Sequence, residues 1–172
     1  MNILLKNIAL SDATKISKWK SNPQLAKEIM SSFQSIDIQA AEQWIIANTE
    51  HKNQELRGIY AKNEHAEELL GISRLMFVDY ESKNAEFGIY LGEKKYQGQG
   101  VGGKALRLML KIGFEELGLL KIYLKVAEKN KRAIKLYQKL NFIQEGCLKE
   151  HYYKNGAFEN VIFMALFREN FL

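Results

Sequence analysis

Cysteine, histidine and proline are scarce in this chain of 172 residues. The single cysteine, Cys147, excludes an internal disulfide and fits a reducing compartment. The histidines His51, His65 and His151 lie too far apart for the ligand spacing of a zinc site, so we expect no metal. The one proline, Pro23, leaves no proline-rich linker between domains.

Long apolar runs are also missing. No stretch approaches the length of a membrane span, and no N-terminal segment has the pattern of a signal peptide. We therefore expect a cytoplasmic protein without membrane contact. The net charge of +5 favours anionic partners in general, but basic and acidic residues are interleaved rather than clustered, so we expect no nucleic-acid partner.

What the chain does contain is enough apolar sequence for one domain with a sizeable core, since 47% of its residues are hydrophobic. The hydrophobic periodicity predicts strands over residues 2–8, 56–61, 69–78, 86–91, 121–127, 148–153 and 161–167. It predicts helices over residues 12–19, 24–30, 38–48, 104–117 and 130–140. This order of elements indicates a single α+β domain over residues 1–172.

Local signals support several of these boundaries. Asp37 is a suitable N-cap for the helix over 38–48, and Asn155-Gly156 between two strand patterns is typical of a β-hairpin. The apolar stripe expected on that helix consists of Ile38, Ala41, Ile45 and either Ile46 or Trp44.

A glycine-rich segment, Gln97-Gly-Gln-Gly-Val-Gly-Gly103, is the most informative part of the chain. Glycine lets the backbone approach a ligand closely, and the segment leads into an amphipathic helix. Free N–H groups at a helix N-terminus bind anions, and Lys104 in the first turn opposes the helix dipole unless an anion is present. We therefore predict that residues 97–104 bind a phosphorylated molecule. The face expected to be buried on the following helix comprises Ala105, Leu106, Met109, Leu110, Phe114 and Leu117.

Two common phosphate motifs overlap this segment. Gly98-x-Gly100-x-x-Gly103 satisfies the dinucleotide pattern, but residues 93–96 separate it from the preceding strand and position 121 is a lysine rather than an acid. A P-loop would need serine or threonine where Ala105 stands. A capped solvent loop, the third reading, rarely needs four glycines.

Two separated motifs resemble the GNAT superfamily of acetyl-CoA-dependent N-acetyltransferases. Strand 86–91 leads to Gln97-x-x-Gly100-x-Gly102, and Asn130-x-x-Ala133-x-x-x-Tyr137-x-x-x-Asn-Phe142 follows with the family's spacing. The resemblance covers residues 69–167, with Asn141 where the family usually has glycine. Residues 145–156 resemble the branch of ribosomal-protein, spermidine and nucleotide-amino-sugar acetyltransferases.

The resemblance implies a mixed, mostly antiparallel sheet of six to seven strands flanked by helices. It implies acceptor-side helices at about 11–48, an acetyl-CoA-binding core at about 69–142 and a C-terminal hairpin at about 143–168, whose strands could form a homodimer edge. Acetyl-CoA is the implied donor, with no metal. The expected cofactor-binding residues are Ile89, Leu91, Gln97, Gly98, Gln99, Gly100, Val101, Gly102, Gly103, Lys104 and Asn130. Asn130 could instead serve only as an N-cap.

Tyr137 stands at the family's position for the general acid, which would protonate the departing thiolate. By periodicity it could equally be a core aromatic. Glu86 is the candidate general base for an alkylammonium substrate, although it could simply end a strand or pair with a basic neighbour such as Lys83. Cys147 has no neighbouring pattern that would activate it as a nucleophile.

The acceptor is the least determined feature. The sequence favours a nucleotide-linked amino sugar or a similar small amine, with a peptide N-terminus or a polyamine as alternatives. A polyamine site would hold several carboxylates, but residues 24–43 contain only Glu28, Asp37 and Glu42. Trp19 and Trp44 suit either substrate contact or packing. A non-catalytic module that only binds acyl-CoA is the rival from a different class.

Overall fold

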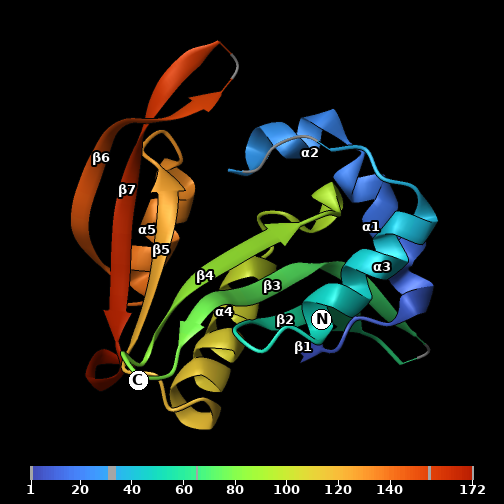
Figure 1. Cartoon of the computed structure of the whole chain (residues 1–172), viewed down its shortest axis with the longest axis horizontal. Helices are drawn as coiled ribbons and strands as arrows, with labels where there is room; N and C mark the ends of the chain where they lie inside the picture. The colour runs from blue at the N-terminus through green and yellow to red at the C-terminus, as the bar shows by residue number, and fades with distance from the viewer. Residues whose placement is uncertain (1, 31–33, 65, 155, 172) are drawn as a thin grey trace.

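One sheet of seven strands runs through the chain, and the computed structural model describes residues 2–30, 34–64, 66–154 and 156–171 (Figure 1). The strand order is β1-β2-β3-β4-β5-β7-β6. The strands are β1 (Asn2–Lys6), β2 (Glu55–Lys62), β3 (Glu67–Asp79), β4 (Asn84–Leu91), β5 (Lys121–Ala127), β6 (Ile143–Lys154) and β7 (Ala157–Phe167). All neighbours pair antiparallel except β4 and β5, which are parallel. The prediction of a mixed, mostly antiparallel sheet is confirmed.

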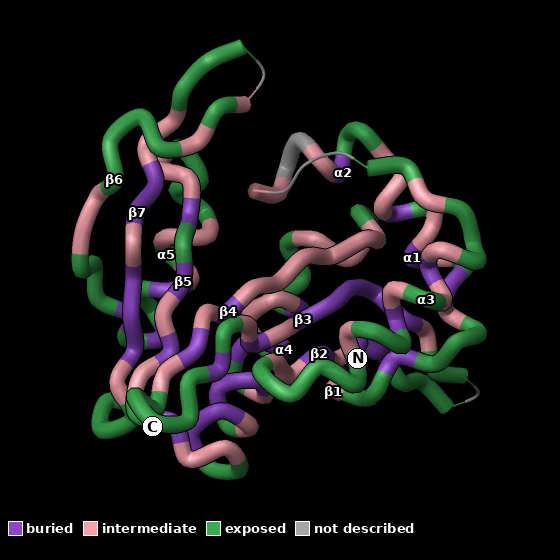
Figure 2. Tube along the Cα trace, viewed as in Figure 1, coloured by how far each residue is buried: buried purple, intermediate pink, exposed green. Residues whose placement is uncertain are grey.

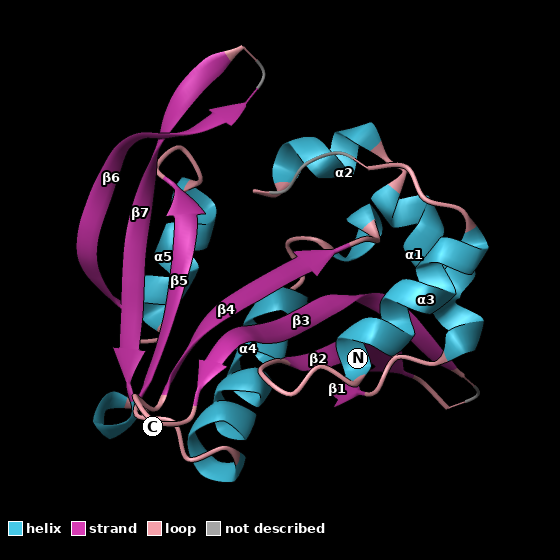
Figure 3. Ribbon diagram, viewed as in Figure 1, coloured by secondary structure: helices cyan, strands magenta, loops and turns pink. Residues whose placement is uncertain are grey.

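Helices cover both faces of this sheet (Figure 3). They are α1 (Ala13–Lys20), α2 (Pro23–Glu28), α3 (Ile38–Thr49), α4 (Val101–Lys111) and α5 (Lys131–Lys139). Short 3₁₀ segments span Leu10–Asp12, Lys94–Tyr96 and Arg168–Asn170, and a π-helical segment, Ile112–Glu116, extends α4. One hydrophobic cluster joins α4 and α5 to β4, β5 and β7, whereas another joins α1 and α3 to β2 and β3. Figure 2 shows the buried positions following the middle strands, between these layers.

The predicted N-cap of α3 is confirmed, because the Asp37 carboxylate accepts a hydrogen bond from the Ala40 N–H at 2.7 Å. The predicted apolar stripe is correct only in its centre. Ala41 and Ile45 are buried and Trp44 packs against the same cluster, but Ile38 and Ile46 are 48% and 44% exposed. α3 packs against α1 and β2 along this central part of the stripe only, so its outer apolar positions stay exposed.

The helix after the glycine-rich segment begins earlier than predicted. It starts at Val101, so Gly102 and Gly103 lie in its first turn, and Gly100 is its N-cap with a φ of 79°. The predicted inner face is confirmed, since Ala105, Leu106, Met109, Leu110 and Phe114 are buried and Leu117 packs against them.

Asn141 occupies the turn position where the family that the sequence resembles usually has glycine. Its φ is 65°, in the left-handed region that asparagine tolerates better than most residues. The turn is closed by the N–H of Phe142, which donates to the Tyr137 carbonyl at 3.0 Å. The Asn141 side chain also donates to the Asn170 carbonyl at 3.2 Å.

The C-terminal hairpin forms as predicted, with Lys154 opposite Ala157 and Gly156 at a φ of 82°. Asn155 of the predicted turn lies outside the described residues, as does His65. β6 forms one edge of the sheet and β1 the other. No helix in the described part of the chain has the length and apolar character needed to cross a membrane.

Candidate functional site

The site begins where β4 and β5 separate. Their parallel pairing covers only three positions, from Asn84 opposite Lys121 to Glu86 opposite Tyr123, although both strands continue (Figure 1). On its other side β4 remains paired with β3 as far as Leu91. In the described residues, the β5-facing edge of β4 from Phe87 to Leu91 therefore has no strand partner. An extended, peptide-like molecule can hydrogen-bond such an edge.

The glycine-rich segment lies just beyond this open edge. Gly98 and Gly100 have positive φ values of 83° and 79°, which side-chain-bearing residues rarely adopt. A Cβ placed on Gly100 or Gly102 would meet no protein atom within 4 Å, so the space in front of both is open. The first turn of α4 offers N–H groups without helical acceptors. This combination fits a pyrophosphate, as the sequence predicts.

Other residues of the glycine-rich segment contribute to packing or to internal hydrogen bonds rather than to the open space. Val101 is buried in the core. A Cβ on Gly103 would lie 3.2 Å from Leu136, so its small size serves the packing of α4 against α5. The Lys104 N–H donates to the Gly100 carbonyl at 3.1 Å, so it is not available to an anion. The Gln99 side chain turns back and donates to the Lys95 carbonyl at 2.7 Å.

Arg132 is a residue that the sequence analysis missed. The guanidinium of Arg132, in the first turn of α5, lies 3.6 Å from the Cβ position of Gly98. It is therefore placed to add a positive charge to the mouth of the glycine-rich segment. Its signal in the sequence was weak, because adjacent basic residues in a helix usually only face solvent.

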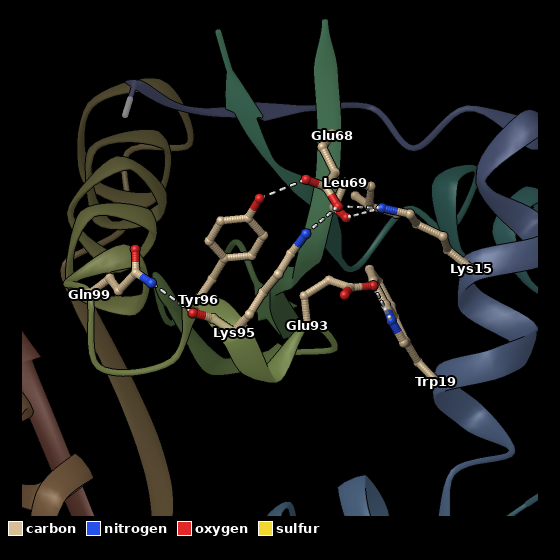
Figure 4. Close-up of polar contacts among 8 residues, drawn as sticks. All are labelled: Lys15, Trp19, Glu68, Leu69, Glu93, Lys95, Tyr96 and Gln99. Carbon is tan, nitrogen blue, oxygen red and sulfur yellow. Dashed lines mark hydrogen bonds and ion pairs between the residues drawn. The ribbon is translucent and has the colours of Figure 1, made fainter.

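The connection between β4 and α4 is anchored to β3 by Glu68 (Figure 4). The Glu68 carboxylate accepts hydrogen bonds from the Tyr96 hydroxyl at 2.7 Å and from Lys15 at 3.2 Å, and Lys95 lies 3.5 Å away. The Tyr96 hydrogen bond is the main cause that lowers the pKa of Glu68. This network ties the glycine-rich segment to both β3 and α1.

Tyr137 lies on the α5 side of the sheet, with its ring 5.7 Å from that of Phe142. It is 8% exposed and part of the core cluster, so the core-aromatic reading describes its packing correctly. Burial raises the pKa of Tyr137 to about 12, which keeps the hydroxyl protonated throughout the physiological range. Core packing and proton donation are therefore compatible at this position.

Glu86 lies on the opposite face, at the last position where β4 and β5 pair. Its carboxylate accepts a hydrogen bond from Lys125 on β5 at 2.8 Å, and its side chain is 12% exposed. The alternative that Glu86 pairs with a basic residue is confirmed, but the partner is Lys125 rather than Lys83, the example that the sequence offered, because adjacency in sequence does not reveal pairing across strands. One carboxylate oxygen of Glu86 has no partner among the described residues and is available to an amine or a water molecule.

Two further expectations have plain outcomes. The Asn130 side chain accepts a hydrogen bond from the Ala133 N–H at 3.1 Å, so Asn130 is the N-cap of α5. Cofactor binding by Asn130 stays a prediction. Cys147 lies on β6, half-buried, and packs against the core as a small apolar residue.

The acceptor face is the side of β3, β4 and β5 that carries Arg74, Glu86, Tyr90 and Lys125. The strand register places Arg74 opposite Gly88 and Glu86 opposite Tyr123, so these side chains share one face. Trp19 from α1 is buried, and its ring centre lies 6.2 Å from that of Tyr90, with the two rings nearly perpendicular. Trp44 is half-buried, with the Lys20 ammonium 4.2 Å from its ring centre. Both tryptophans thus contribute to packing, as one of the two readings predicted.

Comparison with known proteins agrees with this geometry. A family description for the acetyltransferase (GNAT) domain matches residues 2–143. The chain is 33% identical over 129 residues to a spermidine N(1)-acetyltransferase of Escherichia coli, covering 69% of each protein. It is 30% identical over 95 residues to a ribosomal-protein-serine acetyltransferase of Escherichia coli, covering 55% of this chain and 52% of that protein. The crystal structure of a Vibrio cholerae spermidine N-acetyltransferase in complex with CoA and spermine has a TM-score of 0.88 at 23% identity, covering 98% of this chain and 96% of that one.

Proposed function

This chain belongs to the GNAT family of acetyl-CoA-dependent N-acetyltransferases, and from that premise we propose that it acetylates a primary amine of a small molecule, with Tyr137 as general acid and Glu86 as general base. The observation that carries the proposal is the edge of β4 over residues 87–91, which has no strand partner in the part of the chain that the structure describes. It extends from Glu86 toward the glycine-rich segment, so one extended molecule can span both.

The residues present fit acetyl-CoA. The N–H groups at the start of α4, with Arg132 beside them, would hold the pyrophosphate, and the open space before Gly100 and Gly102 leaves room for it. Backbone groups of Ile89 and Leu91 would hold the pantetheine arm. The bound donor supplies an acetyl thioester, whose carbonyl carbon is open to attack by an amine.

Each catalytic residue then moves one proton. Glu86 accepts a proton from the ammonium form of the acceptor, directly or through water, because only the neutral amine has a lone pair for attack. Tyr137 donates its hydroxyl proton to the departing thiolate, and the second proton lost by the nitrogen as the amide forms would restore the hydroxyl. Its raised pKa makes it a weaker acid than free tyrosine, but a thiolate formed in the same buried space is also more basic than in water.

Polyamines are the acceptor class that the relatives favour, since spermidine N-acetyltransferases recur among them. The amino sugar expected from the sequence has no counterpart among those relatives. One observation of the site nevertheless favours an amine attached to an anion. Among the described residues, the acceptor face and its surroundings carry three cations, Lys20, Arg74 and Lys125. They carry two carboxylates, Glu86, which is paired with Lys125, and Glu93, which accepts a hydrogen bond from Trp19.

The proposal is tested by release of free thiol from acetyl-CoA when amines are added one at a time. The panel contains spermidine, a nucleotide-linked amino sugar and a short peptide, with mass spectrometry of each product. We expect amine-dependent thiol release with one added acetyl group on the product. Binding of acetyl-CoA without turnover on any amine would instead identify a non-catalytic acyl-CoA-binding module.

A further inference from the structure

Arg74 on β3 is a partly buried cation without a directly bonded partner in the described residues; the charges of Tyr90 and Glu86 act on it only through space and partly offset the lowering of its pKa by burial. Among the described residues its guanidinium makes no hydrogen bond and no ion pair, and the nearby carboxylate of Glu86 is bonded to Lys125 at 2.8 Å. Burial lowers the pKa of Arg74, although guanidinium remains charged at physiological pH. Leaving such a charge unpaired costs free energy, so this arrangement is expected only where something outside the chain compensates it.

Two neighbours make the same point. Lys20 at the end of α1 is also partly buried; burial lowers its pKa, and repulsion by Arg74 lowers it further. Its ammonium lies over the Trp44 ring at 4.2 Å, which is a contact but not a neutralising partner. The Tyr90 hydroxyl is buried and has no hydrogen-bond partner in the described chain. Burial raises the pKa of Tyr90, and the nearby charge of Arg74 partly lowers it again.

We propose that Arg74 and Lys20 bind an anionic group, a carboxylate or a phosphate, on the molecule whose amine is acetylated. The inference rests on the proposed acetyl transfer and names the class of its acceptor. A planar guanidinium binds both carboxylate and phosphate through two parallel hydrogen bonds, and the flexible ammonium of Lys20 adds a second charge.

The strand register gives the acceptor a size. Arg74 is opposite Gly88, which lies two residues beyond Glu86 on the same strand face. Two residues of a β-strand span roughly 7 Å. An acceptor whose amine reaches Glu86 can therefore carry its anion within about this distance, because Glu86 also lies near enough to Arg74 to raise the pKa of the guanidinium. Spermidine carries only amines and offers nothing to this pair.

Matched acceptors provide the first arm of the test. Glucosamine is compared with glucosamine 6-phosphate and with a nucleotide-linked amino sugar, and 1-aminobutane is compared with 4-aminobutyrate, with spermidine as the polyamine. We expect kcat/KM of the wild type to be at least about tenfold higher for the anionic member of a pair, which is 1.4 kcal/mol. The two pairs distinguish phosphate from carboxylate.

Substitution of Arg74 provides the second arm. Arg74→Met should raise KM for the preferred anionic acceptor about tenfold, leave kcat nearly unchanged and leave the neutral member of the pair unaffected. Arg74→Lys should recover part of the loss. The matched control is Arg57→Met, because Arg57 lies on β2 in the same sheet but is ion-paired with Glu55. That variant should not change the preference.

A binding measurement separates this inference from the proposed reaction. With CoA saturating the glycine-rich segment and chloride replaced at equal ionic strength, inorganic phosphate should raise the melting temperature of the wild type and of Arg57→Met, but not of Arg74→Met. If Arg74→Met does not fold, Lys20→Met takes its place. Phosphate stabilisation without turnover on any amine would keep the anion site and reject the proposed reaction. Efficient acetylation of spermidine with no anion preference and no phosphate effect would overturn the anion site.

Discussion

The proposed donor-binding side of this molecule consists mainly of backbone groups, whereas the proposed acceptor-binding side consists of side chains. The donor side consists mainly of backbone: the open edge of β4, the positive φ of Gly100 and the first turn of α4. The acceptor side consists of side chains from separate elements, with Lys20 on α1, Arg74 on β3 and Glu86 on β4. A backbone site suits a donor shared by a whole family, whereas a side-chain site can change its specificity without changing the fold.

Tyr137 is the proposed general acid, so its substitution should have the largest effect. Tyr137→Phe keeps the ring and its contact with Phe142 but removes the proton donor. We expect kcat to fall about 10²-fold or more, with the dissociation constant of acetyl-CoA and the melting temperature almost unchanged. Single-turnover kinetics give the chemical rate. An unchanged chemical rate would leave Tyr137 as a core aromatic only.

Gly100→Val tests whether the donor side depends on backbone. The substitution forces a branched side chain into a positive φ and fills the open space before the loop. We expect the dissociation constant of acetyl-CoA, measured by calorimetry, to rise about tenfold, while the preference among acceptors stays the same. Gly118→Val is the matched control, because Gly118 has a φ of 66° and open space too but lies at the far end of the helix. Equal loss of binding in both variants would point to general strain.

Glu86→Gln tests the acceptor side and should have a smaller, pH-dependent effect. Glutamine keeps the size of the side chain and can hydrogen-bond, but it accepts no proton. We expect kcat/KM to fall several-fold at low pH and to recover partly at high pH, where more of the amine is neutral. Glu145→Gln is the control, since Glu145 forms a comparable ion pair with Lys121 at 2.7 Å. A loss of equal size at every pH would indicate positioning, and no loss would move the base to an ordered water.

Tyr96→Phe should have the smallest effect, because it loosens the support of the donor side without touching the ligand. It removes the hydrogen bond that chiefly lowers the pKa of Glu68. A carboxyl group whose pKa is lower in the folded than in the unfolded state stabilises the fold at pH values above its unfolded-state pKa. This stabilisation is lost as the pH falls through the folded-state pKa. The melting-temperature difference between variant and wild type should therefore be present at pH 7 and shrink in acid. Tyr80→Phe, whose hydroxyl makes only a 3.5 Å contact, should show no such trend.

The sequence predicted the donor side far better than the acceptor side, for a physical reason. Glycine spacing, the Asp37 and Asn130 caps and strand alternation are local, and each is visible within a few residues. The pairing of Glu86 with Lys125 and the proximity of Lys20 to Arg74 exist only after β3, β4, β5 and α1 assemble. No pattern along the chain shows which distant charges will face each other.

The three-position junction between β4 and β5 also bears on the mechanics of the molecule. It is the strand pairing that joins two groups of strands, here called plates: β1 to β4 and β5 to β7. On one face of the sheet, α4 and the core cluster also hold the two plates together. A donor bound in the opening, as proposed, would contact both plates and act as an added strand between them. Binding would then stiffen the junction between the two plates, so the donor would complete the sheet as well as supply the acetyl group.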